Sequence, residues 1–161
     1  MHERHLGQKN IPRFEGWWGH NKESRFKMGP NFDALPTVEA WQLSNPPIFQ
    51  LASLRASMEL FDVATMKALR KHGDELTGTF ENLLITRLKE KIEVISPIGE
   101  RGSMLCLKFK NDPKKWAHKL REKDVYVDFR EPDIIRATPT PLYNSFSDVY
   151  RLVEIFEEVT N

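Results

Sequence analysis

The sequence predicts an α+β domain, an antiparallel sheet covered by helices, preceded by an irregular N-terminal arm. Residues 1–45 mix polar and aromatic residues with glycines and prolines and show no sustained periodicity. From about Pro46 apolar residues recur at three- and four-residue steps, and from about Ile92 the period becomes two. The resulting order, α-α-β-β-α-β-β-α, is typical of the α+β class.

The arm, residues 1–45, is irregular over a length that is uncommon in a self-contained domain. We interpret it either as a functional loop system or as part of a body that lies elsewhere. A short strand is the one regular element it could contain, between Val38 and Leu43.

A long linking helix is expected over residues 46–73, because Asn45 is a good N-cap and proline is tolerated in a first helical turn. The end is expected near 71–73 (Lys-His-Gly), where a basic residue and a glycine favour a helix C-terminus. Its apolar stripe is Ile48, Leu51, Leu54, Met58, Phe61, Thr65 and Leu69. A second helix then begins the C-terminal domain, residues 74–161, and presents Leu76, Phe80, Leu83, Leu84 and Leu88 on one side.

Alternating residues predict a short strand from Ile92 to Ser96 and a half-buried antiparallel strand from Ser103 to Lys110. Asp112-Pro113 then opens a helix that carries Trp116, Ala117 and Leu120.

Two more strands are expected, from Val125 to Phe129 and from Ile134 to Thr138, joined by a turn at 131–133. Ser145 with Asp148 resembles a capping box at the start of the closing helix. The apolar stripe of that helix is Val149, Leu152, Val153, Phe156 and Val159.

Composition restricts the function classes. The 161 residues carry 24 basic and 23 acidic side chains, so a net charge of +1 gives no global attraction to nucleic acid or to an anionic membrane. A single cysteine, Cys106, excludes an internal disulfide framework and a multi-cysteine metal site, and its place in an alternating strand indicates packing. No run approaches membrane-spanning length and the start has no apolar leader, so we expect a cytoplasmic protein without a bound metal.

The segment 16–20, Gly-Trp-Trp-Gly-His, is the strongest candidate for a binding site. Neighbouring tryptophans cannot share one face of a helix or strand, and the flanking glycines allow a close backbone approach. Each indole joins a flat apolar surface to one N–H donor, which suits a ligand with an aromatic ring and an anion.

Four segments together resemble kynureninase, in that family's order and at about its spacing. They are residues 16–20 (GWWGH), 25–28 (RFKM), 43–48 (LSNPPI) and 136–146 (RATPTPLYNSF). The resemblance covers nearly the whole chain. It implies the C-terminal portion of a pyridoxal-phosphate enzyme of the aminotransferase-like fold: the end of the large domain, then the small domain. Such enzymes, in tryptophan catabolism and NAD biosynthesis, hydrolyse kynurenine or 3-hydroxykynurenine to alanine and anthranilate or 3-hydroxyanthranilate.

The resemblance also implies roles for single residues. Trp17 matches the tryptophan whose indole N–H reaches the cofactor phosphate, and Asn45 matches a second phosphate contact, with Ser44 beside it on the substrate side. Trp18 matches the aromatic residue that lines the pocket for the aniline ring, and an aromatic residue of an interface is the alternative. His20 either contacts the substrate or caps the loop.

Arg136 matches the small-domain arginine that clamps the substrate α-carboxylate, a contact that suits a planar guanidinium. A salt bridge to Asp128 or Asp133 is the structural alternative for this side chain. Arg25 and Lys27 either hold the domain junction or are solvated.

The family's Schiff-base lysine lies upstream of the matching region, and nothing in this sequence reproduces its context. No catalytic residue is therefore expected in this chain, which we predict to be inactive alone because the chemistry of the cofactor requires that lysine. The expected partners are a kynurenine-type substrate and either a second subunit, as in the homodimers of the family, or a missing N-terminal half.

Three alternatives remain open. The basic and aromatic residues of the arm could form a stacking platform for single-stranded nucleic acid, although the balanced charge argues against it. The chain could be an interaction domain without catalysis. A cysteine desulfurase of the same fold would need a nucleophilic cysteine on a mobile loop, which Cys106 does not provide.

Overall fold

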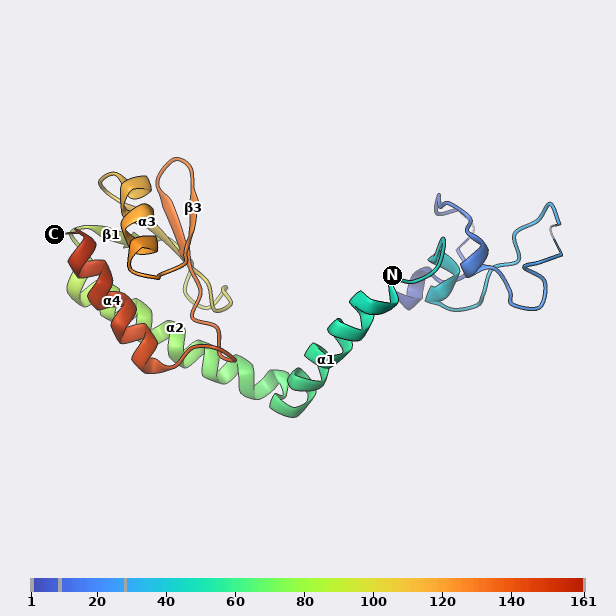
Figure 1. The fold of residues 1–161 in the computed structure, drawn as a ribbon, viewed down its shortest axis with the longest axis horizontal. Helices are drawn as coiled ribbons and strands as arrows, with labels where there is room; N and C mark the ends of the chain where they lie inside the picture. The colour runs from blue at the N-terminus through green and yellow to red at the C-terminus, as the bar shows by residue number, and fades with distance from the viewer. Residues whose placement is uncertain (1, 9, 28, 161) are drawn as a thin grey trace. The chain divides into compact units, whose positions relative to one another are not determined.

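The computed structural model describes residues 2–8, 10–27 and 29–160 (Figure 1). The chain divides into two units, residues 1–59 and 60–161. The division falls within helix α1 (Ile48–Ala64), so the predicted domain boundaries at 45/46 and 73/74 stay predictions.

The first unit is built from irregular chain and three short 3₁₀ helices, as the aperiodic sequence predicts. These are η1 (Glu3–His5), η2 (Trp17–Gly19) and η3 (Val38–Trp41). The strand predicted between Val38 and Leu43 is wrong, because the backbone there bonds locally: the Ala40 N–H donates to the Thr37 carbonyl over 3.1 Å. A segment this short fits one helical turn as well as a strand when no neighbouring strand pairs with it.

Helix α1 begins later than predicted and ends earlier. Ile48 is its first residue, and Asn45 makes no hydrogen bond within the described chain, so the predicted N-cap at Asn45 is wrong. At the other end Thr65 has a φ of 63°, in the left-handed region, which stops α1 at Ala64. The Thr65 hydroxyl then accepts a hydrogen bond from the Ala68 N–H at 3.3 Å and caps helix α2 (Met66–Leu88).

The predicted helix end at 71–73 is therefore also wrong, because α2 runs through Gly73 without a break. Gly73 is buried, and a Cβ atom there would lie 2.8 Å from the Ser103 hydroxyl oxygen. The glycine thus permits close packing of the helix against the segment around Ser103 and Pro141, and does not terminate it.

The second unit contains a four-stranded antiparallel sheet, as predicted, in the order β1-β2-β4-β3. Its strands are β1 (Ile92–Val94), β2 (Leu105–Phe109), β3 (Asp128–Arg130) and β4 (Ile134–Ala137). Helix α3 (Pro113–Glu122) joins the β1–β2 pair to the β3–β4 hairpin, and α4 (Phe146–Thr160) closes the chain. The predicted order of elements is confirmed.

The predicted helix starts of this unit are also confirmed. Asp112 accepts a hydrogen bond from the Lys115 N–H at 3.2 Å and caps α3. In the capping box, the Ser145 N–H donates to Asp148 over 2.7 Å and the Asp148 N–H donates to the Ser145 hydroxyl over 3.3 Å. Val125 differs from the prediction: its N–H bonds to the Leu120 carbonyl, so it closes α3 instead of opening a strand.

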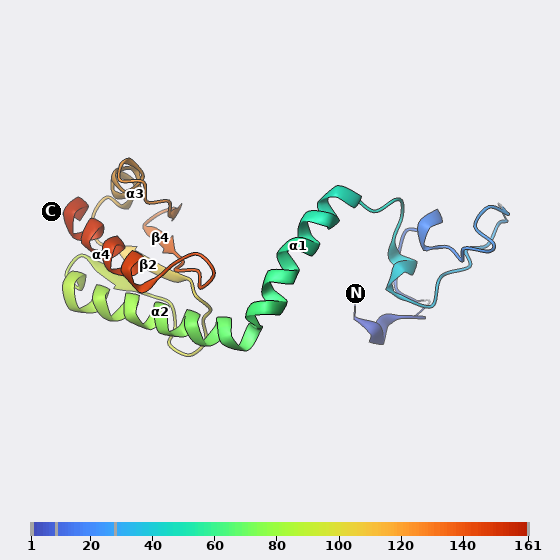
Figure 2. The ribbon, with the colours of Figure 1, turned by 60° about the horizontal axis from the view of Figure 1, so that its bottom comes forward.

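One face of the sheet packs against the helices. α2 and α4 lie side by side beneath it (Figures 1 and 2), and α3 adds Trp116 and Leu120 to the same apolar cluster. The rings of Phe80 in α2 and Phe156 in α4 stack with centroids 6.2 Å apart, and both side chains are fully buried.

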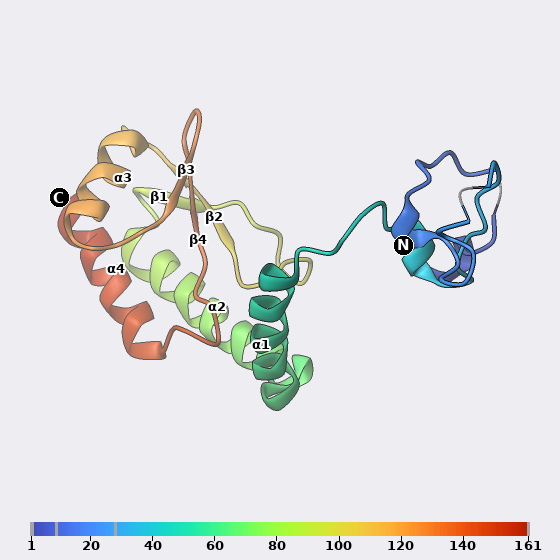
Figure 3. The same ribbon diagram turned by 45° about the vertical axis from the view of Figure 1, so that its right-hand side comes forward.

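The opposite face of the sheet is polar. Figure 3 labels the strands β1, β2, β3 and β4 that form the sheet. Because side chains alternate along a strand, Leu105 and Leu107 of β2 point to the core while Cys106 between them points away. In the same way Ile135 and Ala137 of β4 are buried, and Arg136 is carried on the polar face.

Candidate functional site

The glycines of segment 16–20 allow two stretches of the first unit to touch. A Cβ atom on Gly16 would lie 2.2 Å from the Leu43 Cα, and one on Gly19 would lie 2.5 Å from the Ala40 carbonyl oxygen. Only glycine fits at such distances from backbone. The contact places Trp17 and Ser44, each one residue beyond it, in the same part of this unit.

Arg25 holds the two tryptophans from within the same loop. Its Nη2 donates to the carbonyl oxygens of Trp18 and His20, each over 3.1 Å. The guanidinium carbon lies 5.4 Å from the ring centroids of both Trp17 and Trp18, close enough for cation–π attraction. Arg25 therefore orders the tryptophan segment, a role that the sequence did not indicate. Met28, which ends the segment 25–28, lies outside the described residues.

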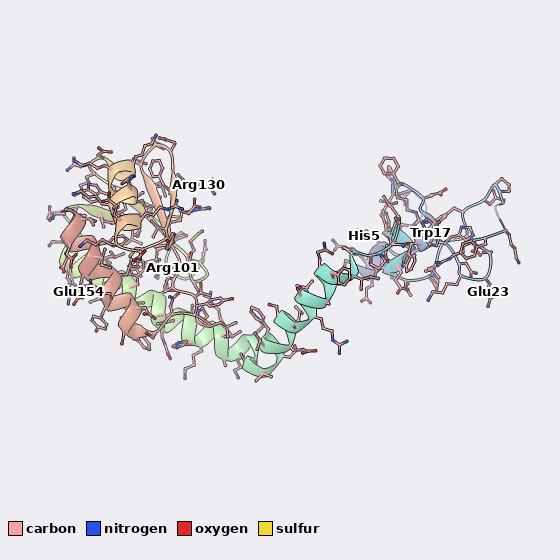
Figure 4. The ribbon with its side chains drawn as sticks, in the orientation of Figure 1. His5, Trp17, Glu23, Arg101, Arg130 and Glu154 are labelled. Atoms are coloured by element: carbon pink, nitrogen blue, oxygen red, sulfur yellow. The ribbon has the colours of Figure 1, made fainter. Side chains whose placement is uncertain are left out.

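Trp17 presents a free donor. Its side chain is 44% exposed, and its indole N–H makes no hydrogen bond within the described part of the chain. Trp18 is half-buried and meets Trp17 edge to face, with ring centroids 5.2 Å apart. Figure 4 shows Trp17 in the first unit. The arrangement leaves one indole edge for an anion and keeps both rings oriented.

His20 is engaged within its own loop. Its Nε2 lies 3.1 Å from the Ser24 hydroxyl oxygen, and that hydroxyl donates to Asp33 over 3.0 Å. Because the hydroxyl hydrogen is given to Asp33, Nε2 of His20 is the donor to Ser24, and Nδ1 makes no hydrogen bond with another described residue. Through Nε2 the ring caps the loop, while Nδ1 stays available for the other predicted role, substrate contact.

Ser44 and Asn45 follow the Leu43 contact and are both exposed. Neither side chain forms a hydrogen bond with another described residue. Since Asn45 is not used as a helix cap, its amide N–H₂ group is available to an acceptor such as a phosphate.

Arg136 forms the salt bridge that was its structural alternative. Its Nε donates to Oδ2 of Asp128 over 2.8 Å, and its Nη2 donates to the same oxygen. Asp128 stands opposite Arg136 in the β3–β4 ladder, and Arg130 donates to it as well, over 3.1 Å. The hydrogen bond from Arg136 is the main cause that lowers the pKa of the Asp128 carboxyl below its ordinary value.

A second salt bridge between an arginine and a carboxylate lies near the start of β2. Arg101 and Glu81 bond through both guanidinium Nη atoms and both carboxylate oxygens, and each side chain is only 13% exposed. The hydrogen bond that Arg101 donates to Glu81 is the main cause that raises the pKa of Arg101. The pair ties the segment before β2 to α2, and we assign it a structural role.

The cavities lie apart from the predicted site residues. A cavity of about 440 Å³ is lined by residues around Tyr126, Pro139 and Leu152 in the second unit, and one of about 850 Å³ by residues around Arg13 and Trp41 in the first. None of the predicted site residues lines either one. The described residues hold no group of three or more metal-ligating side chains and no helix long and apolar enough to cross a membrane.

The five predicted site residues of the arm thus belong to the first unit, and Arg136 belongs to the second. The signal for the Arg136 partner was present in the sequence. A hairpin centred on Pro132 places residues 128 and 136 opposite each other, as the register confirms. No comparable signal pointed to Arg25.

Solved structures share the fold. The cystine C-S lyase C-DES, in complex with its product cysteine persulfide, aligns with 96% of this chain and 40% of its own, with a TM-score of 0.77 and 17% identity. The cysteine desulfurase CsdA of Escherichia coli aligns with 92% of this chain and 38% of its own, with a TM-score of 0.74 and 17% identity. The chain therefore has the α+β small-domain architecture of the pyridoxal-phosphate-dependent aminotransferase-like fold.

Sequence comparison identifies the family. The kynureninase of Myxococcus xanthus is 55% identical over 160 residues, which are 98% of this chain and 37% of that protein. The kynureninase of Koribacter versatilis is 44% identical over 158 residues, 97% of this chain and 37% of that protein. The chain thus spans little more than a third of the length of these curated relatives. The family description "Kynureninase C-terminal domain" matches residues 69–156, and the chain belongs to the kynureninase family.

Proposed function

We propose that this chain is the C-terminal part of a kynureninase that hydrolyses the Cβ–Cγ bond of kynurenine or 3-hydroxykynurenine, giving alanine and anthranilate or 3-hydroxyanthranilate. The observation that carries the proposal is the 55% identity to a kynureninase over 98% of the chain. The Schiff-base lysine would come from sequence outside this chain, which is inactive alone. Bound pyridoxal phosphate supplies the electron sink for bond cleavage next to the substrate Cα.

The donors of the first unit fit the cofactor's phosphate. The free indole N–H of Trp17 and the free amide of Asn45 are both donors, and neither brings a negative charge that would repel the anion. Trp17 and Asn45 would bind the phosphate, and the oriented ring of Trp18 would stack on the aniline ring of the substrate. Ser44 and the free Nδ1 of His20 would contact polar groups of the substrate.

Arg136 would bind the substrate α-carboxylate. Its side chain is 33% exposed and lies on the sheet face that no helix of the second unit covers. A guanidinium and a carboxylate form paired, charge-assisted hydrogen bonds, which both hold and orient the amino acid.

The chain would act together with further protein. Helix α1 has no buried residue, and Ile48, Leu54 and Met58 are 68%, 55% and 53% exposed. Apolar patches of this kind mark surfaces that another body covers. A missing N-terminal portion and a second subunit are the proposed partners, and the cytoplasm is the proposed location.

A chimaera tests the function. The part of the Myxococcus xanthus kynureninase that precedes its aligned region is joined to this chain, and anthranilate fluorescence is followed with kynurenine as substrate. We expect product formation that depends on pyridoxal phosphate, and none from the 161-residue chain alone. An inactive but folded, cofactor-binding chimaera would refute the proposal and favour a non-catalytic interaction domain.

Two substitutions in the chimaera test the sites. Trp17→Phe keeps an aromatic side chain and removes the N–H, so the Kd for pyridoxal phosphate should rise by about 10- to 100-fold, because a hydrogen bond to a charged group contributes about 1.5–3 kcal/mol. Arg136→Lys keeps the charge and removes the paired donors, so the KM for kynurenine should rise at least about 10-fold. Trp41→Phe and Arg87→Lys, in which Arg87 lies on α2 and pairs with Glu157 at 3.6 Å, are the matched controls, and equal effects in a variant and its control would reject that assignment.

A further inference from the structure

Asp128 occupies one edge of the Arg136 guanidinium and leaves the rest available. Both hydrogen bonds, from Nε and from Nη2, reach the single oxygen Oδ2. Within the described residues Nη1 makes no hydrogen bond. Because a guanidinium has five N–H donors, the pair leaves both hydrogens of Nη1 and the second hydrogen of Nη2 for another acceptor.

The sheet register makes this contact a fixed one. Arg136 stands in a row of three residues, between Asp128 on β3 and Cys106 on β2. Cys106 is small and uncharged, so the carboxylate of Asp128 is the group in this row that orients the guanidinium. Opposite residues of an antiparallel pair have Cβ atoms about 4.5–5.5 Å apart, a spacing at which Asp and Arg meet directly.

Asp128 is itself held in place and charged. Arg130, two residues further along β3, donates from Nε to Oδ2 of Asp128 over 3.1 Å. Figure 4 shows Arg130 on the β3–β4 hairpin. The two arginines hold the Asp128 pKa below its ordinary value, chiefly through the hydrogen bond from Arg136, so the carboxylate is ionised at neutral pH.

We propose that Asp128 is a positioning residue, which holds Arg136 so that Nη1 and the outer N–H of Nη2 face a substrate carboxylate; this rests on the function proposed above. Asp128 touches neither the substrate nor the cofactor and acts through Arg136. The opposite role, in which Asp128 competes with the substrate for the arginine, predicts the opposite change in substrate affinity, so one measurement separates the two.

The kinetic test uses the chimaera. Asp128→Asn keeps the size of the side chain and removes its charge, and we expect the KM for kynurenine to rise about 10-fold with kcat changed less than about twofold. Asp128→Glu restores a carboxylate and should return KM toward the parent value. The control is Asp133→Asn, which makes the same charge change in the adjoining turn, where Asp133 lies 3.6 Å from Lys108. A lower KM in Asp128→Asn identifies a competitor, an unchanged KM shows no role, and either result overturns the proposal.

A second measurement does not depend on activity. In the 161-residue chain labelled with ¹⁵N-arginine, the Nε–H signal of Arg136 is assigned by its loss in Arg136→Lys. Asp128→Asn should speed its exchange with water, and Asp133→Asn should leave it unchanged. Unchanged exchange in Asp128→Asn overturns the positioning role. If the parent chimaera forms no anthranilate, the proposed function fails, while this signal still reports whether Asp128 orients Arg136.

Discussion

Replacing Gly73 by alanine sets two effects of opposite sign against each other. In a helix interior alanine is more favourable than glycine by about 1 kcal/mol. The new Cβ would lie 2.8 Å from the Ser103 hydroxyl oxygen, which is 0.6 Å inside the 3.4 Å of ordinary contact. A 30° rotation about χ1 of Ser103 moves this oxygen by about 0.7 Å and costs about 0.5–1.5 kcal/mol. In Gly73→Ala the gain in helix preference and the cost of relieving the clash therefore nearly cancel. We expect the free energy of unfolding to stay close to that of the parent chain.

Gly78 supplies the matched control on the same helix. A Cβ there would meet nothing within 4 Å, so Gly78→Ala measures the helix preference alone and should stabilise the unit by about 1 kcal/mol. In the Gly73→Ala background, Ser103→Ala removes the clashing oxygen and should recover about 1 kcal/mol. The free energies of unfolding are measured by urea denaturation, with circular dichroism as the signal. Each kcal/mol of change in stability should also shift Tm by about 4–8 °C.

Two results would refute this reasoning. If Gly73→Ala stabilised the chain as much as Gly78→Ala, no steric contact with Ser103 would exist. If Gly73→Ala were destabilising by 1 kcal/mol or more and Ser103→Ala did not relieve it, Gly73 would adopt the helix-end conformation that the sequence pattern indicates, since alanine is strained there.

Three further predictions concern the core, the acid stability and the tryptophan segment. Phe80→Ala should lower the free energy of unfolding by about 3–5 kcal/mol in urea, because the side chain is fully buried; a loss below 1 kcal/mol would contradict the packing described. The Asp148 carboxyl has its pKa lowered from 3.8 by hydrogen bonds from Ser145, so it stabilises the fold above that pH and the contribution is lost as the pH falls below it. Asp148→Asn should therefore flatten the acid limb of a Tm-against-pH curve, and an unchanged limb would exclude the cap as its cause. Gly16→Ala, whose Cβ would strike backbone at 2.2 Å, should red-shift tryptophan emission, whereas Gly29→Ala, which meets nothing within 4 Å, should not.

The order of elements in the second unit was predictable because each signal there is local. Alternation over residues 105–109 and the capping box at Ser145 act within a few residues of sequence. The family was equally readable, since the Gly-Trp-Trp-Gly-His segment stands in order with three other segments that resemble kynureninase. For Arg136 the sequence left Asp128 and Asp133 as possible partners, and the register of the hairpin selects Asp128.

The helix boundaries show where local signals fail. Nothing in the residues around Thr65 predicts a left-handed φ, and the apolar stripe continues across it. Gly73 follows a basic residue and a histidine, as a helix end does, yet it is helical because its missing Cβ admits Ser103, thirty residues away. A glycine tolerates several roles, and only the neighbour that approaches it determines which one is used.

The sequence by itself determined the α+β class, the order of strands and helices along the chain and the family, and it supplied the residues that we propose for the site. Only the tertiary structure determined which other residues they contact. It joined Gly16 to Leu43, enclosed Arg25 between two tryptophans and two carbonyl oxygens, and left the indole N–H of Trp17 without a hydrogen bond to any described residue. The physical reason is range: periodicity and capping act over a few residues, whereas contacts and free donors depend on segments that only the folded chain brings together.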